Sequence, residues 1–218
     1  MKLDILNVSV VVLAEQHNPT ILHPYFLRKE EIVPTDWVPA EPPLCTPGFS
    51  IVKYPNGVAL SVEFNKFQVV DEKAHADPTA SQAPEVAIKY IKKLPHVRYT
   101  SVGVNVSGGL LRSDAEQMLI NQFLKKGPWN ADQFKAKALG LRFVYPVESA
   151  DLHLSCDAGY ISRDGRSPQA AAVVVNGNYH TNLSAQSPLA DAEKAILLFK
   201  KRVRHFKSVV HTIFRLEG

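Results

Sequence analysis

The residue types that most often carry chemistry, histidine, cysteine and clustered carboxylates, are dispersed along this chain of 218 residues. The closest histidine–cysteine pair is His153 and Cys156, in the stretch His-Leu-Ser-Cys. If this stretch is a strand, side chains three positions apart point to opposite faces and cannot bind one metal ion without a bulge. We therefore expect a surface histidine and a core cysteine, and no metal site.

The other cysteine, Cys45, lies far from Cys156 in the sequence. Two such thiols give neither a disulfide framework nor a zinc-ligand spacing, and they fit a reducing cytosol. No base or cation stands near Cys45 in the sequence to make its thiol reactive. The remaining histidines are scattered, among them His17, His23, His180 and His211. The sequence therefore predicts no catalytic residue, no cofactor and a protein that is not an enzyme.

A glycine pair precedes a predicted helix in the stretch SGGLLRSDAEQ, residues 107 to 117. A strand, then Gly108-Gly109, then a helix N-terminus could hold an anion. The stretch lacks the G-x-G-x-x-G spacing, a Walker lysine and a following Asp at the required distance. We interpret it as a plain connector.

A basic run, LFKKRVRHFK, occupies residues 198 to 207 and contains no acid. At helical spacing Lys200, Lys201, Arg204 and Lys207 share one face. They are candidates for contacts with a nucleic acid or another anion. The alternative is a solvated helix face whose cations suit the C-terminal end of the helix dipole. The formal charge of +4 and the pI of about 9.0 are too small to decide between them.

Five prolines between positions 34 and 47 predict a stiff loop without regular strand pairing. The loop carries Trp37, Val38 and Leu44, which are candidate anchors for a protein contact because a stiff loop loses little entropy on binding. The alternative is that Trp37 folds back as a lid on its own core.

The apolar patterning predicts both strands and helices. Strands are expected over 4–13, before the turn at Pro55-Asn56-Gly57, and over 58–65, 66–70, 101–107, 139–147, 151–161 and 170–181, where alternation or β-branched residues dominate. Helices are expected after Pro24, over 85–94, from a capping box at Ser113–Glu116 to about 125, and as one long helix from Pro188. Asp164-Gly165 predicts a hairpin tip.

The string Phe26-Leu-Arg-Lys29 returns as Phe123-Leu-Lys-Lys126. A Tyr-Pro pair, a Trp after the helical segment and a Lys-Lys pair in the terminal helix also occur once in each half. Each half reads strand, helical segment, three strands, helix. We therefore predict an α+β fold in a single domain, 1–218, built of two β-α-β-β-β-α pseudo-repeats at about 1–95 and 96–218. The alternative is coincidence among common residue types.

Two such units would form one largely antiparallel sheet with helices on one face. This order of strands and helices resembles the duplicated fold of TATA-box-binding protein, or that of the helix-grip proteins, and the resemblance implies an arrangement but no function. The alternation puts small and polar residues on the open face, with two acids and no Lys or Arg. They are Ser9, Ala59, Ser61, Glu63, Asn65, Ser101, Asn105, Ser107, His153, Ser155 and Asp157. Such a face can pack against another protein or meet water, and it lacks the cations and aromatic wedges of a nucleic-acid saddle.

The N-terminal apolar run is interrupted by Asp4 and Asn7 and closed by Glu15, so it predicts neither a signal peptide nor a membrane span. We expect a cytoplasmic protein of bacterial type, with no membrane contact. The leading hypothesis is a non-enzymatic binding or assembly protein that acts through protein contacts or self-association. The second is a nucleic-acid-binding subunit that uses the basic C-terminal helix.

Overall fold

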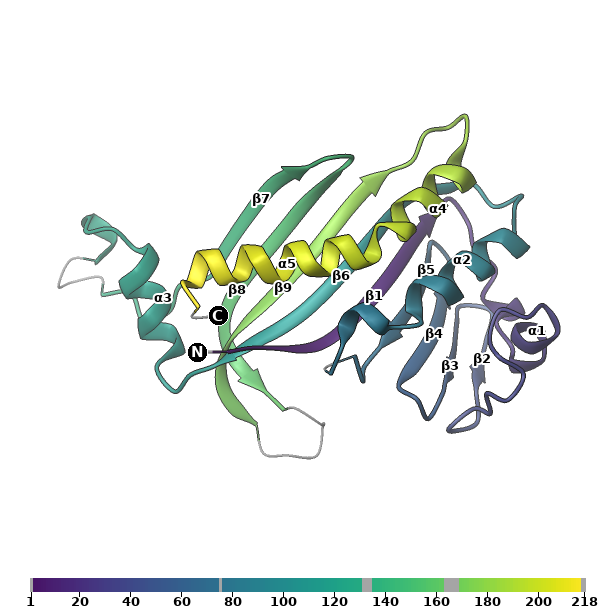
Figure 1. The fold of residues 1–218 in the computed structure, drawn as a ribbon, viewed down its shortest axis with the longest axis horizontal. Coiled ribbons are helices and arrows are strands. Elements are labelled where there is room, and N and C mark those ends of the chain that lie inside the picture. Colours follow the sequence, from purple (N-terminus) through teal and green to yellow (C-terminus); the bar gives the residue numbers. More distant parts are fainter. Residues whose placement is uncertain (1, 75, 131–134, 163–168, 217–218) are drawn as a thin grey trace.

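The computed structural model describes residues 2–74, 76–130, 135–162 and 169–216, which form an α+β fold around a nine-stranded sheet (Figure 1). The strands are β1 (Leu3–Ala14), β2 (Leu44–Cys45), β3 (Phe49–Lys53), β4 (Val58–Glu63), β5 (Lys66–Asp71), β6 (Tyr99–Leu111), β7 (Leu141–Val147), β8 (Ala150–Ile161) and β9 (Ala170–Asn182). The helices are α1 (Pro24–Lys29), α2 (Ala83–Lys93), α3 (Ala115–Phe123), α4 (Pro188–Leu197) and α5 (Phe199–Phe214). Short 3-10 turns are η1 (Pro19–Ile21), η2 (Pro78–Ala80) and η3 (Pro128–Asn130).

The strand order is β2-β3-β4-β5-β1-β6-β9-β8-β7, and every neighbouring pair is antiparallel. The long strands β1 and β6 lie side by side at the centre. On one side of this pair β5, β4, β3 and β2 follow as a meander, and on the other side β9, β8 and β7 do the same. The predicted antiparallel sheet is thus confirmed.

One face of the sheet is apolar, because valines alternate along its central strands. Val8, Val10 and Val12 of β1 are buried and stand opposite valines of β6 that are also buried. Helices α2, α4 and α5 lie across this face (Figure 1). A register shift between Ile5 and Asn7 interrupts the alternation of β1, so that both Ile5 and Val8 are buried.

The predicted terminal helix is confirmed in position but is not continuous. The chain forms α4 and then α5, with Leu198 between them. The predicted apolar stripe is buried along both helices, and it consists of Ala192, Ile196, Phe199, Val203, Phe206 and Val210. The ring of Phe206 packs directly against Gly177 of β9, where the absence of a Cβ allows the helix to approach the sheet.

Several local predictions need correction. The capping box at Ser113 does not form: α3 begins at Ala115, and its N-cap residue Asp114 makes no capping bond with its side chain. Asp114 instead pairs with the guanidinium of Arg112, whose Nη2 donates to Asp114 Oδ2 at 3.1 Å. The proline-rich loop does contain regular pairing, since Leu44–Cys45 pairs with β3.

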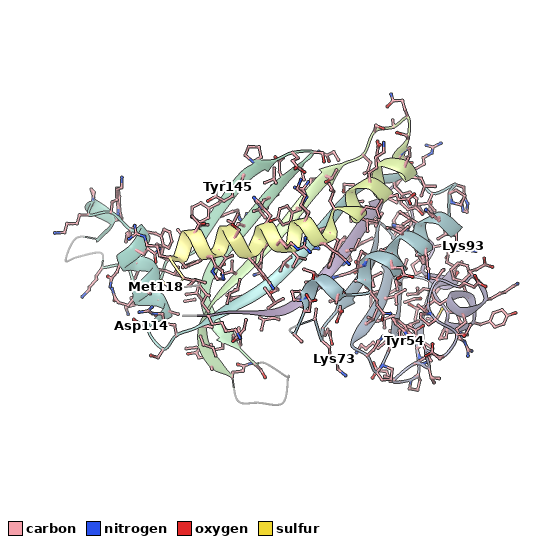
Figure 2. The ribbon with its side chains drawn as sticks, in the orientation of Figure 1. Tyr54, Lys73, Lys93, Asp114, Met118 and Tyr145 are labelled. Carbon is pink, nitrogen blue, oxygen red and sulfur yellow. The ribbon has the colours of Figure 1, made fainter. Side chains whose placement is uncertain are left out.

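The sequence matches between the halves fall at only partly corresponding places. Phe26–Lys29 forms most of α1, whereas only Phe123 of the second string lies in a helix, at the end of α3. Tyr54-Pro55 follows β3, but Tyr145-Pro146 lies inside β7 and not between two strands. Tyr54 and Tyr145 lie toward opposite ends of the molecule (Figure 2). The predicted hairpin tip at Asp164-Gly165 lies outside the described residues.

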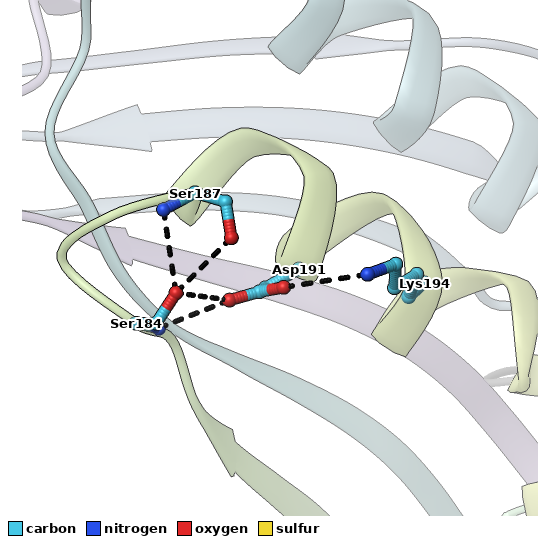
Figure 3. A network of polar contacts seen from close by, with 4 residues as sticks. All are labelled: Ser184, Ser187, Asp191 and Lys194. Carbon is cyan, nitrogen blue, oxygen red and sulfur yellow. Dashed lines mark hydrogen bonds and ion pairs between the residues drawn. The ribbon is translucent and has the colours of Figure 1, made fainter.

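A polar network fixes the connection between β9 and α4 (Figure 3). The backbone N–H of Ser184 donates to Asp191 Oδ2 at 3.2 Å, and the Ser184 hydroxyl donates to the same oxygen at 2.5 Å. The Ser184 hydroxyl also accepts from the backbone N–H of Ser187 at 3.3 Å. Lys194 Nζ lies 3.8 Å from the other carboxylate oxygen. The carboxylate therefore closes the loop onto the first turn of the helix.

We predict that Gly177→Ala destabilises the protein by about 1–3 kcal/mol, the usual cost of overpacking a core. A Cβ at position 177 would lie 2.6 Å from Cδ2 of Phe206, whose ring is buried and cannot move aside cheaply. Urea unfolding measures the change. Gly48→Ala is the matched control, because a Cβ at position 48 meets nothing within 4 Å. Equal unfolding midpoints for the two variants would contradict the packing argument.

We also predict that the Ser184–Asp191 network loses its stabilising effect in acid. The hydrogen bonds from Ser184 hold the pKa of Asp191 below its ordinary value of 3.8. A lowered pKa stabilises the folded state fully above the ordinary value, and this effect disappears as the pH falls through the lowered one. Asp191→Asn should therefore lower the urea midpoint at about pH 7 and change it less at about pH 3. A difference that does not depend on pH would count against the ionised carboxylate.

Candidate binding surface

A hollow of about 620 Å³ opens on the face of the sheet opposite the helices. Every described residue that lines it belongs to a strand, and the strands are β5, β1, β6, β9, β8 and β7. The lining residues are Asn7, Ser9, Gln68, Asn105, Val106, Ser107, Arg142, His153, Leu154, Ser155, Asn176, Gly177 and Asn178. Most of their side chains are carboxamides or hydroxyls.

Strand pairing places these polar side chains in two rows that cross the sheet. One row reads Arg142, Ser155, Asn176, Ser107 and Asn7 on β7, β8, β9, β6 and β1. The second reads His153, Asn178, Asn105 and Ser9 on β8, β9, β6 and β1. Residues two apart on a strand share a face about 7 Å apart, which is the separation of the rows.

Two hydrogen bonds between strands orient part of the lining. Ser107 Oγ donates to Asn176 Oδ1 at 2.6 Å, and Asn105 Nδ2 donates to Ser9 Oγ at 3.2 Å. Each bond joins strands that are neighbours in the sheet, and the Asn105–Ser9 bond spans the central β1–β6 pair. Packing and pairing therefore fix these side chains before any ligand binds.

Other lining groups have no hydrogen-bond partner within the described part of the chain. Asn178 Oδ1 is buried and accepts no bond, which is costly for an amide oxygen. It lies close to the backbone of Gly103, where a Cβ would come within 2.9 Å of it. Asn7 and Gln68 likewise form no bond with their side chains to described residues. The side-chain amides of Asn7 and Gln68 are thus free to bond to a ligand, whereas Asn178 Oδ1 is buried against the sheet.

The charge of the lining is small. Arg142 is exposed and forms no ion pair with a described residue, and none of the described lining residues has a carboxylate. His153 lies beside His180 with ring centroids 6.3 Å apart, and His180 Nε2 lies 3.0 Å from Asn182 Oδ1. The described lining therefore carries one permanent cation at its β7 end, and the exposed Asp151 and Asp157 stand on the same face of β8, two residues beyond His153 and Ser155.

The predicted open face is correct for the five positions that line the hollow, Ser9, Asn105, Ser107, His153 and Ser155. The expectation that this face carries no Lys or Arg is wrong, because Arg142 on β7 lies in the same row as Ser155. Sequence reasoning also missed Asn176 and Asn178. Their signal was present, since Asn176, Asn178, His180 and Asn182 alternate with less polar residues along β9.

The predicted protein-contact residues lie away from the hollow. Trp37 is half-buried, and its ring lies 4.9 Å from that of Tyr54, so it covers the local core. Val38 and Leu44 are exposed, with 65% and 49% of their surface accessible. Leu44 lies in the short edge strand β2.

The predicted basic face of the last helix is less uniform than its sequence indicates. Lys201 forms an ion pair with Glu148 and, together with Arg202, lowers the pKa of that carboxyl. Lys200 and Arg204 are exposed and form no ion pair with a described residue. Lys207 is half-buried. The helix lies on the side of the sheet opposite the hollow, so one local ligand cannot contact both.

Arg202, in the same run, is buried, with 2% of its surface accessible. Its Nη1 donates to the carbonyl of Val147 at 3.1 Å, and its guanidinium lies 5.2 Å from the centre of the Tyr179 ring. The Tyr179 hydroxyl in turn lies 2.7 Å from Nδ1 of His205. Burial and the nearby Arg202 charge lower the pKa of His205. These contacts hold α5 against the β7–β8 turn and serve the fold.

The other chemical candidates do not assemble into a site. His153 is exposed and Cys156 is buried, as predicted, and burial raises the pKa of the Cys156 thiol to about 12. Gly108-Gly109 lies within β6 and not between a strand and a helix. No cluster of three or more His, Cys, Asp or Glu side chains suited to a metal occurs among the described residues. None of the described helices is both long enough and apolar enough to span a membrane.

Comparison with known proteins adds no functional information. The chain matches no protein-family model, and no curated protein shows significant sequence similarity to it.

We predict that Arg142→Ala and Gln68→Ala change the free energy of unfolding by less than about 0.5 kcal/mol, because neither side chain has a hydrogen-bond partner among the described residues. Ser107→Ala removes the bond to Asn176 and should cost about 1 kcal/mol. Urea titrations of the three variants test this. If Arg142→Ala were as destabilising as Ser107→Ala, Arg142 would have a structural role and not be free for a ligand.

Proposed function

We propose that this chain is a non-enzymatic, cytoplasmic binding or assembly protein, and that the hollow on its open sheet face receives a protein partner. The observation that carries the proposal is the set of unused hydrogen-bonding groups in a pre-formed hollow. The side-chain amides of Asn7 and Gln68 are only partly buried and have no partner among the described residues, so they can bond to a ligand without giving up an internal hydrogen bond.

The lining favours binding over catalysis. A nucleophilic serine needs a base within hydrogen-bond reach, about 2.6–3.2 Å. Ser155 and His153 share the open face, but they are two residues apart on one strand and no hydrogen bond joins them. The carboxamides that dominate the hollow donate and accept hydrogen bonds but do not titrate near neutral pH.

A second contact surface is proposed at the sheet edge near β2. Val38 and Leu44 are exposed there, and Trp37 supports the loop from beneath through its contact with Tyr54. Exposed apolar residues on a loop that is held in place lose little entropy when a partner covers them. This surface could join a partner or a second copy of the chain to the assembly.

We also propose that the two halves are diverged pseudo-repeats in a TATA-box-binding-protein-like or helix-grip-like arrangement. The strand order supports this proposal, because β1 and β6 are central and the later strands of each half form a meander that runs inward from the sheet edge to the central pair. A helix follows the first strand in both halves. The extra edge strand β2 and the division of the last helix are the departures from symmetry.

The second candidate function is nucleic-acid binding through α5. Lys200 and Arg204 favour it, since both are exposed on one helix face. Lys207 lies near enough to Asp77 to contribute to the lowered pKa of that carboxyl, which is set mainly by bonds from Thr79. Lys201 forms an ion pair with Glu148, so nearby carboxylates neutralise part of the cationic face. We therefore rank nucleic-acid binding second.

One experiment separates the two functions. Tagged wild-type protein, Arg142→Glu with Asn178→Leu, and Lys200→Glu with Arg204→Glu are used for pull-downs from native cells, with and without nuclease. We expect a stoichiometric protein partner that resists nuclease, is lost from the hollow variant and is retained by the helix variant. The reverse pattern, with nuclease sensitivity, would favour nucleic-acid binding. A partner that binds all three proteins equally would refute both assignments.

A further inference from the structure

The hollow is elongated across the strands and not along them. Its lining spans six neighbouring strands but only one to three residues of each. With strands about 4.8 Å apart, the five steps from β5 to β7 give a length of about 24 Å, against a width of about 7 Å between the rows. A hollow of this shape is long enough for about seven residues of an extended polypeptide, at about 3.4 Å per residue. It fits such a segment better than a compact small molecule.

Both rows of the hollow contain side-chain amides, and each amide has both a donor and an acceptor. A carboxamide has an N–H₂ and a C=O, which are complementary to the N–H and C=O of a peptide bond. An extended polypeptide presents such groups to both sides along its length. Asn7 and Asn178 lie in different rows, and both have groups without a partner among the described residues. Main-chain recognition therefore satisfies the lining without requiring one particular side chain at each position.

The charge distribution adds a second requirement. Among the described lining residues Arg142 is the single Lys or Arg, it stands at the β7 end, and none of the others has a carboxylate. A guanidinium binds a carboxylate through two parallel hydrogen bonds. A segment that crosses the strands would place a carboxylate, from a side chain or its own C-terminus, at that end.

The same lining disfavours other extended ligands. Single-stranded nucleic acid binds through several cations and through aromatic side chains on which bases stack. The residues of the hollow that the structure describes include one arginine and no Phe, Tyr or Trp. A polyanion would leave most of its phosphates unpaired here.

We propose that the hollow binds an extended, acidic polypeptide segment lying across the strands, with its main chain bonded to the carboxamides and a carboxylate bonded to Arg142. This rests on the proposed function, in which the hollow is the binding surface. The segment would lie on the sheet face without adding a strand to its edge.

The test selects random 12-residue peptides with free C-termini on the full-length protein. Enriched peptides are synthesised and their binding is measured by fluorescence anisotropy at low and high salt. We expect Asp or Glu, or a required free C-terminus, in the enriched set, and C-terminal amidation separates the two carboxylate sources. Arg142→Glu should weaken binding at least tenfold. Arg204→Glu, the same charge reversal on the opposite side of the sheet, should change binding less than twofold.

A second pair of changes tests the main-chain contacts. Asn178→Leu should weaken binding about tenfold, and methylation of single peptide nitrogens should weaken it at two or more positions. The inference is overturned if no peptide is enriched, or if enriched peptides bind the Arg142→Glu and Asn178→Leu proteins as tightly as wild type. Urea midpoints close to wild type for Arg142→Glu confirm that the loss is not unfolding.

A parallel selection with random 20-nucleotide single-stranded DNA distinguishes the possible failures. If oligonucleotides, and no peptides, bind in a way that depends on Arg142, the polypeptide inference fails and the hollow remains a binding surface. The proposed function fails as well under two joint conditions. The pull-down partner binds the hollow variants as well as wild type, and no peptide or oligonucleotide binds wild type more tightly than those variants.

Discussion

The antiparallel pairing of β1 with β6 is the constraint on which the rest of the molecule depends. The two strands are far apart in the sequence, yet they pair along almost their whole length. Their valines form the centre of the helix-facing core, and without this pair the two meanders would be separate, each with an exposed edge. The same pairing sets Asn105 against Ser9 on the other face. One register therefore fixes both the middle of the core and the middle of the hollow.

The two faces of this sheet have different chemical roles because side chains alternate along every strand. The apolar face is covered by α2, α4 and α5 and supplies the hydrophobic stabilisation. The opposite face does not pack against helices, so it can carry amides and hydroxyls. Several of these groups have no partner among the described residues. The shift in register near Ile5 is what turns Asn7 onto this face while Ile5 stays buried. This departure from regular alternation thus adds Asn7 to the polar surface that Ser9 of β1 already reaches.

The cations of the basic run, residues 198 to 207, have different roles in the folded protein. Arg202 is buried and holds α5 to the end of β7, and Lys201 pairs with Glu148 at the adjacent turn. The cation that faces the hollow, Arg142, comes from a strand with no basic cluster in its sequence. A run of charges therefore does not by itself identify a binding surface. Here the unpaired charge with a neighbouring set of hydrogen-bonding groups is the more informative feature.

The sequence alone determined the α+β class, the antiparallel sheet, the buried stripe of the last helix and the polar character of the open face. These follow from periodicity, which is a local property of the chain. It did not determine that Arg142, Asn176 and Asn178 stand in rows with Ser9 and Asn105, because that depends on which strands become neighbours and in which register. Nor did it show that Arg202 is buried or that Asp114 prefers Arg112 to a helix cap. Register and long-range contacts are decided by the packing of the whole chain, and only the tertiary structure brings those residues together.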